Sequence, residues 1–302
     1  MNRRRILRGI AEEFRGNKKT IIKELLQGKV KMETSSKKMN HMKSPSRQLY
    51  YGLIKATTEH MYSLYEYQKY AESNPAALIP TVTIIRRYAI DGKLTRMENF
   101  IDGKLECITE YQFNAKGQVI SSLDIDPAGI HTRRSVNIYN KDGLIEEWRV
   151  YSDMVNLDFR MLYSYDSQGK LFSESLIHEN HEEYSISFYE HLDDNTIISI
   201  SKDDKGRFIE KTIEEYDPTG NLISFRNYDE SGRLNRAGFY TYDIHINQLS
   251  VKMKHYSEEG IEHTGREYEY LYDHKDNWIR AIHQAGEDKY SNVCIREIEY
   301  YT

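Results

Sequence analysis

YDSQGKL (165–171), YDPTGNL (216–222) and YDESGRL (228–234) are three copies of one short phrase. The phrase is an aromatic residue, Asp or Asn, two variable residues, Gly and often an apolar residue. The Asp or Asn side chain can accept a hydrogen bond from a backbone N–H two residues on, and Gly supplies the positive φ of a hairpin turn. Weaker copies are YAIDGKL (88–94), FNAKGQV (113–119), YNKDGLI (139–145) and YSEEGIE (256–262). The phrase therefore predicts a turn, and its recurrence predicts an array of turns.

The turn glycines recur with a fixed period. One set, Gly92, Gly117, Gly143 and Gly169, has spacings of 25, 26 and 26 residues. A second, interleaved set includes Gly103 and Gly129, and Gly206 and Gly232, each pair 26 residues apart. The repeat unit is thus about 26 residues with two turns, which leaves strands of roughly nine residues, or about 30 Å. This unit is a long β-hairpin, repeated.

The segments between the turns favour strands. VTIIRRY (82–88), SISFYEH (185–191), NTIISIS (195–201) and REYEYLY (266–272) are rich in β-branched and aromatic residues. Tyr268, Tyr270 and Tyr272 alternate with Glu267, Glu269 and Leu271, so one face of that strand is aromatic and the other largely charged. The 25 tyrosines are interpreted as ring contacts across neighbouring strands, with a ligand-stacking surface as the alternative. The tentative binding residues on this tyrosine-rich face are Tyr165, Tyr216, Tyr228, Tyr268, Tyr270, Tyr272 and Trp278.

The predicted fold is mainly β: a curled antiparallel array of ~26-residue β-hairpin repeats, some 16 strands, after a short α-helical N-terminal segment. Three regions are expected. Residues 1–48 form a basic helical and linker segment, residues 49–80 an amphipathic helix that docks on the array, and residues 81–302 the repeat domain.

The helix in residues 49–80 is expected to be capped by Ser44 or Ser46 and to end near Glu72, before Asn74 and Pro75. Its apolar stripe recurs at intervals of three and four residues: Tyr50, Ile54, Thr57, Met61, Leu64, Gln68 and Ala71. Docking on the nearest hairpin is favoured over a coiled coil, for which Thr57 and Gln68 are poor seam residues. Docked in this way, the helix would shield the exposed edge strand that begins the array.

Composition fits a protein with a thin core. The 302 residues are 39% hydrophobic and 29% charged, with a formal net charge of −5. No run approaches 18 consecutive apolar residues and no secretory signal is visible, so neither a transmembrane segment nor export is predicted and the expected location is the cytoplasm. Cys107 and Cys294 stand alone, which argues against a disulfide scaffold or a structural zinc site.

Positive charge is concentrated at the N-terminus. Residues 1–48 hold 14 Lys or Arg and four Glu, a net of +10, so the remainder carries −15. The segment could be a solvated tail, contact acidic surface on the same chain, or bind nucleic acid or an anionic membrane. All three interpretations stay open. The basic patch comprises Arg3, Arg4, Arg5, Arg8, Lys18 and Lys19.

No catalytic motif is present in the sequence. Patterns typical of a serine nucleophile, a zinc hydrolase or a nucleotide site are absent. The densest group of metal-capable residues is His178, His181, Glu182 and His191, and His255 and His263 flank the turn at Gly260. His178 and His181 are three residues apart and would point to opposite faces of a strand. We therefore predict no catalytic residues, no metal and no cofactor.

The phrase resembles the tyrosine–aspartate (YD) repeats of the bacterial Rhs family, which also occur in insecticidal toxin-complex proteins and in teneurins. The resemblance covers roughly residues 82–301, and the C-terminal stretch EYLYDHKDNWIRAIHQAGEDKY also resembles the end of small repeat proteins of Bacteroidetes-type bacteria. In the large relatives the hairpins spiral into a shell around a toxic C-terminal domain. The resemblance implies a repeat scaffold, but about eight hairpins are too few for such a shell, and a toxin domain is not expected.

The large relatives also cleave themselves at a pair of closely spaced DPxG motifs. Here DPAG (126–129) and DPTG (217–220) are 91 residues apart. Asp126 and Asp217 are accordingly expected to be turn residues, and self-cleavage is not predicted.

The leading functional prediction is a non-enzymatic protein-binding scaffold of a bacterial cell, either an immunity or antitoxin-like protein or part of a larger assembly. The alternative is a carbohydrate-binding protein or hydrolase with its site on the concave face. A third prediction is a nucleic-acid or membrane tether through residues 1–48.

Overall fold

The computed structural model describes residues 53–178, 184–257, 259–285 and 291–302, all of which belong to the unit formed by residues 41–302. The described helices are α2 (Leu64–Tyr70) and the 3-10 helix η1 (Pro75–Ala77). The strands are β1 (Ile54–Ser63), β2 (Val82–Tyr88), β3 (Leu94–Ile101), β4 (Lys104–Phe113), β5 (Val119–Ile125), β6 (His131–Tyr139), β7 (Ile145–Tyr151), β8 (Leu157–Tyr165), β9 (Leu171–His178), β10 (Tyr184–His191), β11 (Thr196–Asp203), β12 (Phe208–Tyr216), β13 (Leu222–Tyr228), β14 (Leu234–Tyr242), β15 (Gln248–Ser257), β16 (Gly260–Tyr272), β17 (Trp278–Ala285) and β18 (Asn292–Tyr300).

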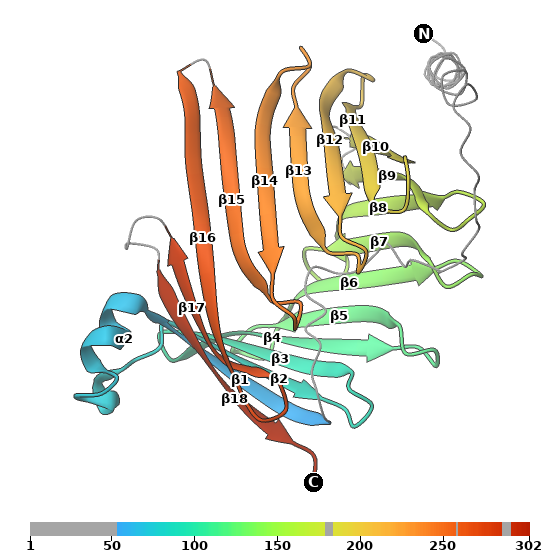
Figure 1. Cartoon of the computed structure of the whole chain (residues 1–302). Coiled ribbons are helices and arrows are strands. Elements are labelled where there is room, and N and C mark those ends of the chain that lie inside the picture. The colour runs from blue at the N-terminus through green and yellow to red at the C-terminus, as the bar shows by residue number, and fades with distance from the viewer. Residues whose placement is uncertain (1–52, 179–183, 258, 286–290) are drawn as a thin grey trace. The chain divides into compact units, whose positions relative to one another are not determined.

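These strands form one closed antiparallel sheet. From β2 onward each strand pairs with the next one in the chain, and β1 pairs with both β18 and β2 (Figure 1). Thr57 is the register partner of Ile298 on one side and of Arg86 on the other. The prediction of a mainly β fold built from antiparallel hairpins is confirmed. The finer prediction of a curled array of some 16 strands is wrong, because the described sheet has 18 strands and closes on itself.

Strand β1 lies where the sequence predicted a helix. Residues 54–63 are extended, and only Leu64–Tyr70 are helical, with the Ser63 hydroxyl accepting a hydrogen bond from the Glu66 N–H (3.2 Å). An extended β1 satisfies the backbone groups of β2 and β18, which would otherwise be exposed sheet edges. A helix would leave both edges unpaired. Pairing with distant strands therefore outweighed the helical preference that the apolar stripe indicated.

The hairpin turns have the predicted chemistry. The Asp166 carboxylate accepts hydrogen bonds from the N–H groups of Gln168 (2.8 Å) and Lys170 (2.9 Å), and Gly169 has a φ of 79°. Asp126 and Asp217, expected to be turn residues, act in the same way and are confirmed as such. The same pair of bonds recurs at Asn114, Asn140, Asp203, Asp229, Asp243 and Asp273.

Two turns keep this geometry without the glycine. Ile246 and Asp276 occupy the glycine position of the phrase with φ values of 65° and 58°. A left-handed conformation costs an L-residue about 1–2 kcal/mol, and a β-branched residue such as Ile tolerates it poorly. The turn conformation is therefore imposed by the flanking strands and the Asp side chain.

Alternation along the strands gives the sheet two faces. Most buried strand residues share one face: Thr57, Glu59, Thr109, Val150, Ile197, Phe225, Asn227, Ala281, Cys294 and Arg296. Four buried strand residues, Ala56, Ser224, Ala237 and Val293, lie on the other face. Side chains converge on the concave side of a closed sheet, so we assign the first set to the inner face and the second to the outer face.

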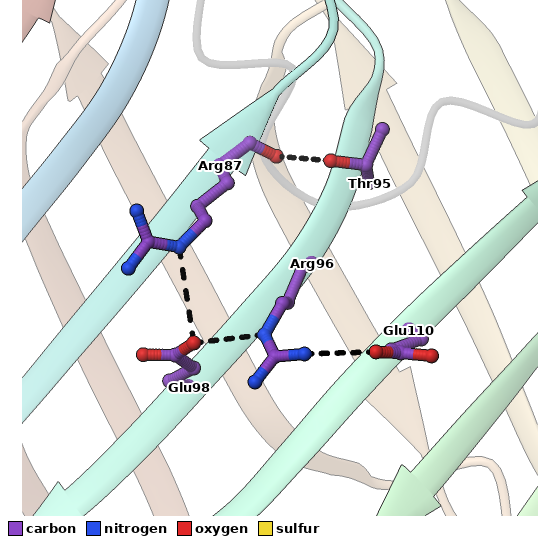
Figure 2. A network of polar contacts seen from close by, with 5 residues as sticks. All are labelled: Arg87, Thr95, Arg96, Glu98 and Glu110. Carbon is purple, nitrogen blue, oxygen red and sulfur yellow. Dashed lines mark hydrogen bonds and ion pairs between the residues drawn. The ribbon is translucent and has the colours of Figure 1, made fainter.

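The outer face carries ladders of opposite charges. Figure 2 shows one on β2–β4, in which Arg96 bonds to Glu98 (2.8 Å) and to Glu110 (2.9 Å), while Arg87 lies 3.8 Å from Glu98. The Thr95 hydroxyl also donates to the Arg87 carbonyl (3.0 Å). Partly exposed pairs of this kind contribute about 0–1 kcal/mol each. These ion pairs place opposite charges on neighbouring strands, so they favour one strand register more than they stabilise the fold.

A buried charge cluster lies where the chain ends meet. The Glu59 carboxylate on β1 accepts from Arg296 of β18 (2.7 Å) and pairs with Arg86 of β2 (2.7 Å). The Arg296 guanidinium lies over the Trp278 ring, 3.2 Å from its centroid. Burial favours a raised pKa for Glu59, but Arg296 and Arg86 outweigh burial and hold the pKa below its ordinary value of 4.5. We call Glu59, Arg86 and Arg296 the seam cluster.

Replacing Glu59 by Gln should destabilise the fold strongly, by about 3–5 kcal/mol, because it leaves two arginines near a buried site without their carboxylate. The lowered pKa adds a pH dependence. The contribution of Glu59 is complete above its unfolded pKa near 4.5 and is lost as pH falls through the lower folded value. Urea unfolding between about pH 7 and pH 3 measures both effects.

The matched control is Glu299→Gln, which removes an exposed partner of Lys55 at the same pair of strands. Little change is expected there. Equal losses in the two variants, or an undiminished acid sensitivity in Glu59→Gln, would contradict a role for the seam cluster in closing the sheet.

Candidate functional site

The aromatic residue of the phrase ties neighbouring hairpins together. The Tyr139 hydroxyl donates to the Val119 carbonyl (2.7 Å) and the Tyr165 hydroxyl to the Ile145 carbonyl (2.7 Å), each 20 residues back in the chain. Tyr242 repeats the bond to Leu222 (2.8 Å). His191 takes the tyrosine's place, with its Nε2 3.0 Å from the Leu171 carbonyl. The first residue of one phrase thus bonds to the apolar residue that closes the previous one.

Most tyrosines predicted to bind a partner have their hydroxyls engaged inside the fold. Besides Tyr165, Tyr216 donates to Glu214 (2.8 Å), Tyr270 to the Gln248 carbonyl (3.1 Å), and Tyr272 to Asp243. Burial raises the pKa of Tyr165 and of Tyr270 to about 12, with further charge effects at Tyr270. These side chains are first of all structural.

The predicted set does not form one surface. Tyr228 lies on the outer face, beside Lys211, and precedes the β13–β14 turn at the opposite end of the strands from Tyr165. Tyr268 and Tyr270 stack at 6.5 Å, and Tyr270 contacts Trp278 at 6.1 Å, whose ring Arg296 covers. This inner-face cluster adjoins the seam cluster. The basic patch from Arg3 to Lys19 lies outside the described residues.

The histidines singled out by the sequence are not assembled. His255 pairs in register with Glu262, and His263 with Lys254, so the two histidines point to opposite faces. His181 and Glu182 lie outside the described residues. Within the part of the chain that the structure describes, no three His, Cys, Asp or Glu side chains gather in a metal-binding arrangement.

A pocket of about 260 Å³ opens on the inner face across β4–β7. Its floor is made of small residues, Ser122 and Ser135, whose hydroxyls are hydrogen-bonded to each other (2.8 Å). Larger residues on the flanking strands form its sides. The seven residues that line it are Thr109, Tyr111, Ser122, Asp124, Arg133, Ser135 and Trp148.

The polar groups of the pocket form a row across three strands. Thr109, Asp124 and Arg133 are register partners on β4, β5 and β6, and the Thr109 hydroxyl donates to one Asp124 oxygen (2.8 Å). Arg133 is exposed and has no ion pair within the described residues. Burial, and then the Asp124 charge, raises the pKa of Tyr111 and keeps its hydroxyl protonated. The row and the neighbouring Tyr111, which pairs with Ser122, thus offer a carboxylate, a guanidinium and a phenol to the same pocket.

An aromatic wall bounds the pocket on β7. The Trp148 ring meets Phe159 of β8 edge to face, with centroids 5.4 Å apart and planes at 85°. Because Phe159 contacts the indole from the side of β8, it fixes the ring while the pocket lies on the side of β6. Such a convergence of a few polar groups and an aromatic surface is typical of a small-ligand site.

Sequence reasoning missed every pocket residue. The local signal was alternation, since Thr109 and Tyr111, Ser122 and Asp124, and Arg133 and Ser135 are spaced two apart and so share a face. Their meeting depends on the register of three strand pairs, which the alternation does not specify.

No protein-family model matches the chain, and no curated protein matches it. Among solved structures the chain is similar to a porin-like protein from Bacteroides uniformis, with 13% identity, 82% of this chain and 98% of that chain covered, and a TM-score of 0.39. It is also similar to part of a TcdB2–TccC3–Cdc42 complex, with 14% identity, a TM-score of 0.30, and 71% of this chain but 15% of that chain covered. Likenesses this low assign neither a family nor an activity, and the family stays a prediction.

The described helices are all too short or too polar to cross a membrane. This finding does not support the predicted cytoplasmic location, which stays a prediction.

Replacing Tyr165 by Phe should lower the free energy of unfolding by about 0.5–1.5 kcal/mol, because the Ile145 carbonyl loses its hydrogen bond. Tyr228→Phe is the control, since the structure shows no hydrogen bond from the Tyr228 hydroxyl to a described residue. Urea midpoints at constant m value make the comparison. If the two variants lose the same stability, the tie between hairpins is not a stabilising contact.

Proposed function

We propose that this protein is a non-enzymatic binding protein that holds a small polar ligand in the β4–β7 pocket. The observation that carries the proposal is the lining of that pocket: a serine floor, one carboxylate, one guanidinium and two aromatic side chains converging on about 260 Å³. The volume suits a ligand of the size of a single ring with its substituents.

The same lining favours binding over hydrolysis. Glycoside hydrolysis ordinarily needs two carboxyl groups on either side of the scissile bond. Among the residues that line the pocket, Asp124 is the single carboxylate, and Thr109 already donates to it. Ser122 and Ser135 bond to each other, and the residues that line the pocket include no histidine or lysine that could serve as their base. This lining supports the proposal of binding rather than cleavage.

The predicted protein partner is a separate matter. The inner-face tyrosines expected to contact a protein partner mostly form hydrogen bonds between neighbouring hairpins or ring contacts beside the seam cluster. No other feature of the described residues favours such a partner. Binding of a protein, an immunity role, and a nucleic-acid or membrane contact through residues 1–48 all stay predictions.

Filling the pocket tests the proposal. Ser122→Trp places an indole on the pocket floor, whereas Ser121→Trp places the same indole on the opposite face, because adjacent strand residues alternate. A collection of small metabolites is screened by ligand-observed NMR against the full chain and both variants, with circular dichroism to check folding.

We expect ligands that bind the native chain and Ser121→Trp but not Ser122→Trp, and whose spectra stay unchanged during hours of incubation. Binding that survives the filled pocket would refute the site. Conversion of a bound compound would refute the non-enzymatic assignment.

A further inference from the structure

We infer that the ligand of the β4–β7 pocket is an uncharged saccharide, a pyranose ring whose apolar face lies on Trp148 and whose neighbouring hydroxyls bridge Asp124 and Arg133. This inference rests on the proposed function and names the class of ligand.

The first argument is the charge balance of the pocket. Asp124 and Arg133 are register partners on adjacent strands, yet the structure shows no ion pair between these two described residues. Each of these two side chains can therefore form hydrogen bonds to a ligand. A ligand with one formal charge would be attracted by one of these side chains and repelled by the other. Two adjacent hydroxyls satisfy both, since one donates to the carboxylate and the other accepts from the guanidinium.

The second argument is the number of open donors. The structure shows no hydrogen bond from the Tyr111 hydroxyl or the Trp148 indole N–H to a described residue, although both side chains line the pocket. Elsewhere on the inner face, Tyr139 and Tyr165 donate to carbonyls. With Arg133, the pocket thus presents three donor groups and one carboxylate within a small volume. A polyol, which carries both donors and acceptors on every carbon, matches this set better than a ligand with a single polar end.

The third argument is the aromatic wall. A pyranose ring has one face of C–H groups and a rim of hydroxyls, so it needs an apolar platform beside polar partners. Trp148 on β7 pairs with Asn137, four residues along β6 from Arg133, but its indole lines the same pocket as the Asp124 and Arg133 side chains, so a ring placed on the indole presents its hydroxyls to that pocket. Phe159 fixes the indole in place. A phosphate ligand would instead meet the Asp124 charge with one arginine opposite it.

The experiment measures binding of the full chain to methyl glycosides of neutral hexoses by calorimetry, beside a uronic acid, an amino sugar and a zwitterionic amino acid. Trp148 reports binding by fluorescence. The chain has two tryptophans, so Trp148→Phe should abolish the ligand-induced change while Trp278→Phe keeps it.

At least one neutral glycoside should bind, and Asp124→Asn should weaken it about tenfold or more. Asp126→Asn is the control. Because Asn140 accepts the same pair of backbone hydrogen bonds in its own turn, an Asn at position 126 should preserve the turn and leave the affinity unchanged. Trp148→Leu should also weaken binding about tenfold.

Pocket-dependent binding of the amino acid, uronic acid or amino sugar in preference to every neutral glycoside would overturn this inference and leave the proposed function standing. Glycoside binding that persists in Ser122→Trp would overturn both. An affinity unchanged in Asp124→Asn would overturn the inferred bridge between Asp124 and Arg133.

Discussion

Closure of the sheet depends on a single strand, β1, which pairs with β18 and β2 at once. Without it, the first and last hairpins would each end in a row of unsatisfied N–H and C=O groups. The residues on its inner side are unusual for a strand core: Thr57 and Glu59 are buried, and Glu59 joins both neighbours through Arg296 and Arg86. A buried ion cluster is a weak source of stability but a strong constraint on register. Its position at the seam fits that use.

The residues of the repeated phrase have two structural roles. The Asp and Gly of each phrase build a turn, and the aromatic residue bonds to the hairpin beside it, so the phrase connects repeats as well as ending them. Because these contacts hold one end of the hairpins together, the middle of the inner face can carry small residues. The serine floor of the β4–β7 pocket is such a place, where volume is left open and polar groups remain available.

The turns and the strands between them could be predicted from sequence, because residues such as Asp166 and Gly169 determine the turn conformation through local hydrogen bonds and a positive φ. Closure could not. Ile54, Thr57 and Met61 recur at helical spacing, and their extended conformation is decided by partners more than 230 residues away in β18. The pocket was missed for a related reason. Asp124 and Arg133 look like ordinary alternating strand residues until the register of β5 and β6 places them side by side.

The central claim is that residues 54–63 form the strand that closes the sheet. Met61 and Cys294 are register partners on β1 and β18, so Met61→Cys creates a cross-strand pair that can form a disulfide. Under mild oxidation we expect one intramolecular link between positions 61 and 294, identified by peptide mapping. Met253→Cys on β15, three strands from β18, should give no link to Cys294. Failure of the 61–294 link, or a link from position 61 to Cys107 instead, would contradict the closed sheet.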